Sequence, residues 1–178
     1  MKAATTPEDL VRLLQDRGAP VTGNELADLC GVTRTVIVHD IALLRAAGEP
    51  ISATPQGYVF NPGEADTRRR FSAQLAVQHG PAVELIEKEL NAIVDEGAFI
   101  RDVIVEHPVY GEIRGLLTLG SRHDVAEFCR RMRQTGAEPI SSLTEGVHLH
   151  TIEAPDLQTI ERARRVLERL GLLVDETA

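Results

Sequence analysis

Residues 21–60, VTGNELADLCGVTRTVIVHDIALLRAAGEPISATPQGYVF, decide the fold of the first part of the chain. Gly31 stands four residues after Ala27, where a tight turn between two helices favours a residue without a Cβ. The segment after Gly48 then folds back as a hairpin, and the whole pattern predicts a winged helix-turn-helix, a device that reads DNA. The apolar residues at helical spacing are Leu26, Ala27, Cys30, Val32, Ile37, Ile41 and Leu44.

The residues that follow the turn are those we expect to meet DNA. Thr33 can cap the second helix through its hydroxyl, which places Arg34, Thr35 and His39 along one exposed edge. In this fold the N-terminal part of the second helix contacts base edges, and arginine pairs bidentately with guanine. We therefore predict DNA contacts from Thr33, Arg34, Thr35 and His39, with Arg34 foremost. The alternative is a protein-interaction module, a role that winged helices also have.

Length and composition predict two domains in an ordinary globular protein. The chain has 178 residues, of which 43% are hydrophobic and 26% charged, and the boundary falls at Pro62 and Gly63. We expect a DNA-binding domain over residues 1–61 and a second domain over residues 62–178. No apolar run approaches the roughly 20 residues that cross a bilayer, so a membrane role is not expected.

Cysteine usage and the N-terminal sequence predict a cytoplasmic location. Cys30 and Cys129 are far apart and outside any Cys-x-x-Cys motif, and MKAATTPEDL lacks the apolar stretch of a secretory signal. The chain carries a formal charge of -8, and residues 1–60 hold 5 Lys and Arg against 7 Asp and Glu. Because non-specific affinity comes from phosphate neutralisation, we expect tight DNA binding only from a dimer.

The second part of the chain has alternating strand and helix patterns. Strands are predicted over 71–79, 99–107, 111–119 and 144–153, with helices over 81–97 and 121–136 and a last helix from 156 to 170. The order β-α-β-β-α-β is typical of a ferredoxin-like, split βαβ domain in the α+β class, with an antiparallel sheet. The first and fourth strands should be neighbours, which brings His79 close to His148 and His150.

This convergence predicts a metal site. His148 and His150 are two residues apart in a strand, so their imidazoles project from the same face and can meet on one ion. Glu87, on the helix after Pro81, can add a carboxylate. We predict His79, Glu87, His148 and His150 as the ligands of one divalent ion, and this ligand type suits zinc, nickel, cobalt or iron equally. The alternatives are a solvent-facing histidine pair and a buried hydrogen-bond network.

The chain resembles a known family over nearly its whole length. The resemblance rests on GNELADLCGVTRTVIVHDIALLRAAG and ISATPQGYVF in the first domain, and on QHG, IVDEG, DVIVEHPVYG and LTEGVHLHTI in the second. These motifs are similar to those of the niacin-responsive transcriptional repressors of the NiaR/YrxA type, in which a winged helix-turn-helix precedes a three-histidine (3H) domain. The resemblance implies a repressor of genes for NAD synthesis, niacin salvage or niacin uptake, with nicotinic acid as co-repressor. Carried over by position, it also implies His79, Glu87, His148 and His150 as metal ligands.

A nicotinic acid molecule would need an anchor for its carboxylate and an apolar wall for its ring. A metal with an open coordination position can hold the carboxylate, and Arg101 or Arg114 are the alternatives. His107 and Tyr110, from the turn after the second strand, are candidates for stacking on the ring or hydrogen bonding to it, although a histidine before proline often only fixes a turn. The sequence does not decide between nicotinic acid and nicotinamide.

The resemblance and the charge balance together predict a homodimer on operator DNA. A two-fold dimer joined through its second domains would space the recognition helices about 34 Å apart, or a multiple of it, on a near-palindromic operator. Two rival functions stay open. A metal-responsive repressor would use no organic ligand. A metal-dependent hydrolase is disfavoured because the chain lacks His-Glu-x-x-His, a phosphate loop and Gly-x-Ser-x-Gly, so we do not expect an enzyme.

Overall fold

The computed structural model describes residues 6–61 and 71–174. The chain divides into two compact units, Met1–Ala65 and Asp66–Ala178, which we call the N-terminal and C-terminal units. Within the described ranges, no helix has both the length and the apolar character needed to span a bilayer. Each unit has its own hydrophobic core and is described by itself.

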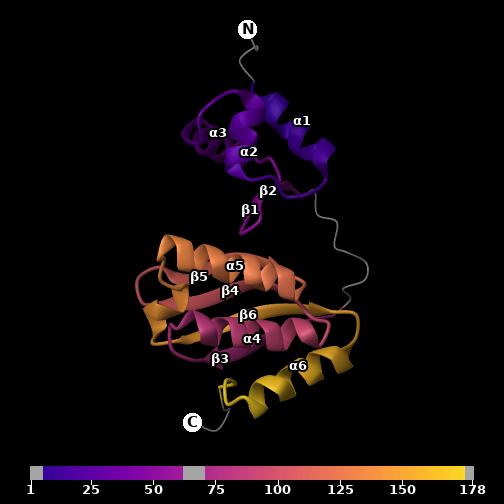
Figure 1. Cartoon of the computed structure of the whole chain (residues 1–178), viewed down its shortest axis with the longest axis vertical. Coiled ribbons are helices and arrows are strands. Elements are labelled where there is room, and N and C mark those ends of the chain that lie inside the picture. The colour runs from indigo at the N-terminus through magenta and orange to yellow at the C-terminus, as the bar shows by residue number, and fades with distance from the viewer. Residues whose placement is uncertain (1–5, 62–70, 175–178) are drawn as a thin grey trace. The chain divides into compact units, whose positions relative to one another are not determined.

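The N-terminal unit is a winged helix-turn-helix, as predicted (Figure 1). Its elements are α1 Pro7–Arg17, α2 Gly23–Cys30, α3 Arg34–Ala46, β1 Ile51–Thr54 and β2 Gly57–Phe60. The strands β1 and β2 form the antiparallel wing. The core comprises Leu10, Leu14, Val21, Leu26, Ala27, Cys30, Ile37, Ile41 and Ile51.

Local sequence fixes the ends of α2 and α3, the two helices of the helix-turn-helix. The Thr22 hydroxyl accepts a hydrogen bond from the Glu25 amide at 3.2 Å, and the Glu25 carboxylate accepts one from the Thr22 amide at 2.9 Å, which starts α2. Gly31 ends α2 in the left-handed conformation with φ 68°. The Thr33 hydroxyl then caps α3 by accepting from the Val36 amide at 3.4 Å. The predicted turn and N-cap are confirmed.

The C-terminal unit has the predicted β-α-β-β-α-β order with a final helix (Figure 1). Its elements are β3 Phe71–Gln78, α4 Val83–Asp95, β4 Phe99–His107, β5 Gly111–Leu119, α5 Arg122–Thr135, η1 Ile140–Thr144, β6 Val147–Ala154 and α6 Leu157–Arg169. The four strands form one antiparallel sheet in the order β3-β6-β4-β5. Both βαβ units are therefore split, because β6 separates β3 from β4 and β4 separates β5 from β6.

The sheet register brings the distant histidines together. In the antiparallel pair of β3 and β6, Val77 lies opposite His148 and Leu75 opposite His150. In the pair of β4 and β6, Val103 lies opposite His150. The prediction that the first and fourth strands are neighbours is confirmed, and the two β6 histidines project from one face because side chains alternate along a strand.

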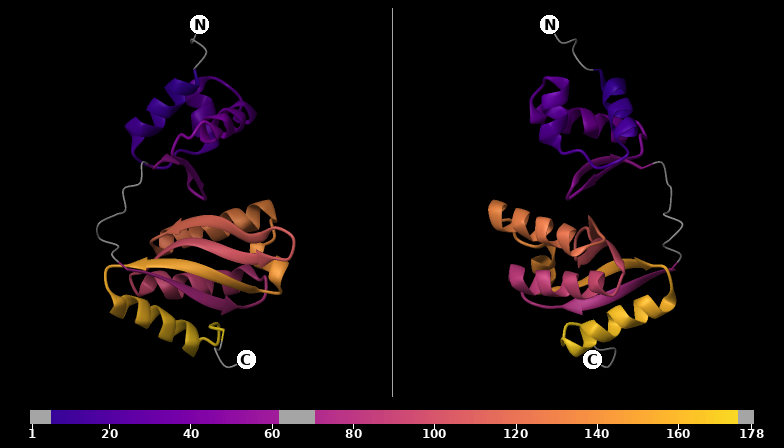
Figure 2. Two further views of the ribbon diagram at one scale, coloured as in Figure 1. Left: turned by 180° about the vertical axis from the view of Figure 1, so that it is seen from behind. Right: turned by 45° about the vertical axis from the view of Figure 1, so that its right-hand side comes forward.

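One face of the sheet carries the core of the C-terminal unit. The left view of Figure 2 shows the strands in front of α4 and α5, which cover the far face. Both helices contribute buried residues to a core that also includes Leu75 of β3 and Ile152 of β6. Helix α6 packs against α4, β3 and β6. The covered face is the one on which the histidines lie, so they are enclosed between sheet and helices.

Candidate functional site

Three histidines meet at one end of the covered face of the sheet. His79 follows the last residue of β3, while His148 and His150 lie in β6. Ring centroids are 5.1 Å apart for His79 and His148, and 4.9 Å apart for His148 and His150, and both ring pairs are nearly perpendicular. All three residues are buried. The Nε2 atoms of all three rings lie within 3.4 Å of one carboxylate, which marks the centre of the group.

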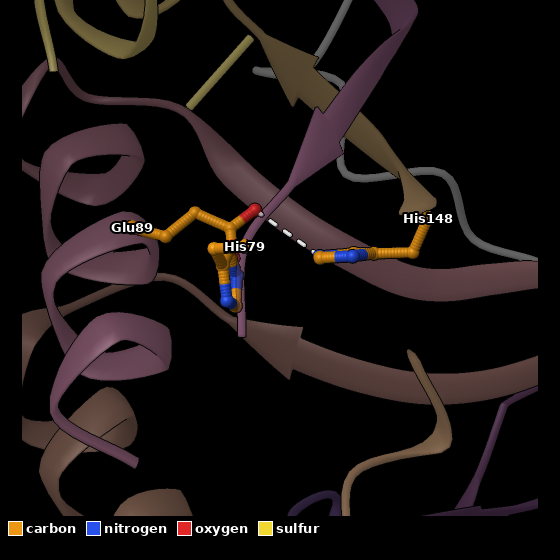
Figure 3. A group of neighbouring side chains, drawn as sticks. All are labelled: His79, Glu89 and His148. Carbon is orange, nitrogen blue, oxygen red and sulfur yellow. Dashed lines mark hydrogen bonds and ion pairs between the residues drawn. The ribbon is translucent and has the colours of Figure 1, made fainter. Parts of the chain in front are cut away.

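A buried carboxylate occupies that centre. Glu89 of α4 is 1% exposed, and its Oε2 lies 2.6 Å from His79 Nε2. Its Oε1 lies 3.4 Å from His148 Nε2 and 3.1 Å from His150 Nε2. Figure 3 shows the Glu89 side chain reaching from α4 to His79 and His148. We call His79, Glu89, His148 and His150 the His–Glu cluster.

The sequence-based choice of Glu87 as the carboxylate does not agree with this geometry. Glu87 points out of the cluster, and its Oε2 accepts a hydrogen bond from Arg133 Nη2 of α5 at 2.7 Å. The reason is the helical period, because two residues differ by about 200° around a helix. Glu89 shares the buried face of α4 with Ile86, Leu90 and Ile93, whereas Glu87 faces away.

Backbone carbonyls fix the orientation of all three imidazoles. Nδ1 of His79 lies 2.7 Å from the Gly80 carbonyl oxygen, Nδ1 of His148 lies 2.9 Å from that of Gly146, and Nδ1 of His150 lies 2.8 Å from that of Asp102. Since a carbonyl oxygen can only accept, each Nδ1 carries the proton and donates it. The three Nε2 atoms, all turned to Glu89, are therefore the ones available as ligands. Metal-binding histidines usually have such a second partner.

The electrostatics of the cluster favour an ionised carboxylate and raise the pKa of two of the imidazoles. Burial raises the pKa of Glu89, but His150, His148 and His79 outweigh it and hold that pKa well below its ordinary value. Burial also lowers the pKa of His79 and of His150, yet the Glu89 carboxylate outweighs it and both pKa values are raised. Without an ion, His79 and His150 therefore keep a proton to higher pH than an ordinary histidine does.

Two buried atoms of the cluster have no hydrogen-bond partner of good geometry, namely Glu89 Oε1 and His150 Nε2. Once His150 keeps only the proton on Nδ1, its Nε2 presents a lone pair, and a lone pair facing a carboxylate oxygen is repulsive. A cation between them removes this repulsion. One ring nitrogen each of His79 and His148 and a Glu89 oxygen all lie within 4.8 Å of one another, so one ion can reach them together. The donor set of imidazole and carboxylate thus fits a divalent transition metal.

An apolar pocket opens beside the cluster and encloses about 370 Å³, including its mouth. The cluster forms its polar end. Val103 and Leu117 of the sheet and Phe128 and Met132 of α5 form much of its walls, and Pro139 and Ile140 also line it. No lysine or arginine is among the described residues that line it. Such a pocket suits a flat apolar body with one polar group directed at the cluster.

The arginines that could have bound a ligand carboxylate are engaged elsewhere. Arg114 donates to Asp102 at 2.8 Å and to Glu112 at 2.7 Å, and Arg101 pairs with Glu153. Arg114 lies opposite Ile104, the neighbour of the pocket residue Val103, so alternation along the strand puts it on the other face of the sheet. The pocket therefore has no guanidinium available to it within the described residues.

His107 and Tyr110 do not lie in this pocket. They belong to the turn between β4 and β5, where their rings pack with centroids 5.0 Å apart. His107 Nδ1 accepts hydrogen bonds from the Val109 amide at 3.2 Å and from the Tyr110 amide at 3.3 Å. Tyr110 is 77% exposed. The structure gives His107 a role in holding the turn, and it does not bring either residue to the His–Glu cluster.

The predicted DNA-contacting residues lie together at the start of α3. Thr33, Arg34, Thr35 and His39 are all exposed. The Arg34 side chain lies close to Gly23 at the start of α2 and to Tyr58 of the wing. A Cβ built on Gly23 would be 3.5 Å from Arg34 Nε and 3.5 Å from a Tyr58 ring carbon. His39 Nδ1 lies 3.3 Å from Asp40 Oδ1. The exposed edge that the sequence predicted is present.

Comparison with known protein families agrees with this division of the chain. An HTH domain matches residues 7–59, and the 3H domain matches residues 72–176. The fold thus defines a regulator with a DNA-reading unit joined to a 3H unit.

Two relatives match almost the whole chain. The transcription repressor NadR of Bacillus subtilis (strain 168) is 42% identical over 176 residues, which cover 99% of this chain and 97% of the relative. The "Probable transcription repressor NiaR" of Thermotoga maritima is 47% identical over 169 residues, which cover 95% of this chain and 93% of the relative. The chain belongs to the family of NadR/NiaR-type transcription repressors with HTH and 3H domains. The relatives are repressors rather than enzymes, in agreement with the prediction.

Proposed function

We propose that this repressor controls genes of NAD synthesis, niacin salvage or niacin uptake, and that nicotinic acid is its co-repressor. We place the acid in the pocket of the C-terminal unit, against a metal ion held by the His–Glu cluster. The observation that carries this proposal is the buried convergence of three Nε2 atoms on Glu89, beside an apolar pocket.

His79, Glu89, His148 and His150 would hold the ion, with Glu89 in the place first assigned to Glu87. Nickel, zinc and iron all accept this donor set. A bound divalent ion supplies a positive charge that can accept the carboxylate of a small acid. The Nδ1 hydrogen bonds to backbone carbonyls keep the three imidazoles in the orientation that this role needs.

The pocket supports an organic ligand rather than the ion alone as the signal. Its walls are apolar, and Phe128 and Met132 of α5 can cover the face of a pyridine ring. Because no described lysine or arginine lines the pocket, the carboxylate of nicotinic acid depends on the ion for its charge partner. We therefore propose that the acid binds only to metal-loaded protein. His107 and Tyr110 have no part in this proposal because they lie outside the pocket.

In the N-terminal unit we propose that Thr33, Arg34, Thr35 and His39 contact operator DNA. We also propose a homodimer, joined through its C-terminal units, on a near-palindromic operator. A dimer would compensate for an N-terminal segment whose residues 1–60 include more acidic than basic side chains. Nicotinic acid acts as a co-repressor if it binds the DNA-competent arrangement of the dimer better than the incompetent one.

Isothermal titration calorimetry tests the sensing part of this function. Nicotinic acid is titrated into protein loaded with nickel or zinc and into protein stripped with a chelator. We expect saturable binding to the loaded protein and no heat of binding to the stripped protein. Binding of equal strength to both would contradict the metal anchor. The absence of binding to either would favour a repressor that responds to the metal alone.

A further inference from the structure

Helix α3 exposes two valines that are not part of the core of the N-terminal unit. Val36 and Val38 are 41% and 40% exposed, whereas Ile37 between them is 1% exposed and packs in the core of the N-terminal unit. Two residues along a helix differ by about 200°, so the two valines emerge on opposite sides of α3. They can therefore be compared as a matched pair with different surroundings.

Val38 lies on the side of α3 that carries its arginines. Arg34 precedes it by one helical turn and Ala42 follows it by one turn, so all three share a side. Arg45 lies eleven residues after Arg34, which returns the helix to almost the same direction. This side is thus a short apolar strip, Val38 and Ala42, between two exposed cations.

Val36 lies in a different environment. It lines a small hollow with Thr6, Leu10 and Asp40, next to α1. That side of α3 is turned toward the body of the N-terminal unit and has an acidic rather than a basic neighbour. Since DNA is a polyanion, the Arg34 side of α3 is the one whose charge complements it.

Val38 is neither in the core of the N-terminal unit nor among the hydrophobic residues packed against it. Valine is a poorer helix former than alanine at an exposed position, because its branched side chain loses rotamer freedom against the preceding turn. An apolar side chain between cations on a recognition helix has one matching feature in the major groove. That feature is the C5-methyl group of thymine, which distinguishes thymine from the other bases by apolar contact.

We propose that Val38 is a specificity-determining residue that reads the methyl group of one thymine in each half of the operator. The contact lies one helical turn beyond Arg34, so the thymine is close to the base that Arg34 contacts. The inference does not depend on nicotinic acid or on a metal, since it concerns only the N-terminal unit.

The test removes single methyl groups from DNA without changing any hydrogen-bonding group. Full-length protein first selects its preferred duplex from a random-sequence pool, with nickel and nicotinic acid present. Each thymine of that duplex is then replaced in turn by deoxyuridine, and affinity is measured by fluorescence anisotropy. For the wild type we expect about fourfold weaker binding at one thymine of each half-site, the value for one methyl group removed from water. Val38→Ala should show less than a twofold effect at that same thymine.

Val36→Ala is the control, because Val36 is equally exposed but lies on the other side of α3. It should keep the wild-type pattern of sensitivity, and circular dichroism establishes that both variants are folded. A wild-type protein insensitive to every methyl group would overturn the proposal. So would a Val38→Ala variant that keeps full sensitivity, or a Val36→Ala variant that alone loses it. Repeating the anisotropy without nicotinic acid shows separately whether the co-repressor proposal fails.

Discussion

Replacing Glu89 by glutamine should remove most of the metal affinity of this protein. Glutamine keeps the size of the side chain but not its charge, and its amide can present only one oxygen to the three Nε2 atoms that now face the carboxylate. Loss of a residue that only orients a ligand typically costs 10–100-fold in metal affinity. Because Glu89 itself faces all three imidazoles, we expect a loss of about 100-fold or more.

The matched control for this change is Glu87→Gln. Glu87 lies on the same helix two residues earlier, and its side chain is partly exposed and paired with Arg133 of α5. An exposed ion pair of this kind contributes about 0.2–1 kcal/mol, so the variant should lose little stability. Its affinity for nickel or zinc should stay within about twofold of the wild type, because the substitution disturbs the ion pair with Arg133 and leaves the His–Glu cluster unchanged.

Competition with a chromophoric chelator measures both affinities on the same scale. We expect the metal affinity of Glu89→Gln to be much weaker than that of the wild type and the metal affinity of Glu87→Gln to be unchanged. Equal losses would show that the charge of α4 as a whole, rather than one ligand, attracts the ion. A greater loss in Glu87→Gln would refute the geometry of the cluster and restore the assignment made from the sequence.

The pKa values of His79 and His150 are raised, so both histidines keep a proton to higher pH than usual, and a metal must displace it. Metal affinity should therefore fall as pH decreases through neutrality. Calorimetry in two buffers of different ionisation enthalpy should detect the released protons, and their absence would contradict the raised pKa values. Phe128→Ala should weaken nicotinic acid binding about 3–10-fold while metal affinity stays constant, as expected for loss of an aromatic contact. An unchanged affinity for nicotinic acid in calorimetry would exclude a contact between Phe128 and the pyridine ring. Arg34→Ala should cost about 1–3 kcal/mol of specific operator binding in gel shifts without changing nicotinic acid affinity; a parallel loss of both would contradict separate modules.

The histidine convergence could be predicted because it depends on only two regularities of sheets. Side chains alternate along β6, which puts His148 and His150 on one face, and antiparallel pairing of β3 with β6 sets Val77 opposite His148. Neither regularity needs knowledge of side-chain packing. The same holds for the helix-turn-helix, whose turn and cap at Gly31 and Thr33 are encoded by local residues.

The sequence predicts Glu87 and the geometry favours Glu89 because the direction of each side chain depends on the phase of α4. The helix was predicted from Pro81, but it begins at Val83, and its inward direction is set by packing on the sheet. The sequence did hold a usable signal. Glu89 falls between Ile86 and Ile93 within the apolar stripe, and a carboxylate in such a stripe requires a partner for its charge.

The pocket could not be predicted from sequence. Its walls combine α5 with Pro139 and Ile140, and the short helix η1 was not expected at all. Whether those residues enclose space depends on how the helix and the following loop pack against the sheet, which has no periodic signature. For the same reason the sequence favours His107 and Tyr110 as ligand-binding residues. In the structure they belong to a turn and do not line the pocket.

We propose that the His–Glu cluster couples a small acid to DNA binding through a metal. The most direct measurement is the affinity of the protein for its operator duplex, by fluorescence anisotropy, as nicotinic acid is added to metal-loaded and to metal-stripped protein. Couplings between two binding sites are typically about 5–150-fold. We predict that the acid tightens operator binding within this range in the loaded protein and has no effect in the stripped protein. Equal tightening in both would contradict the claim.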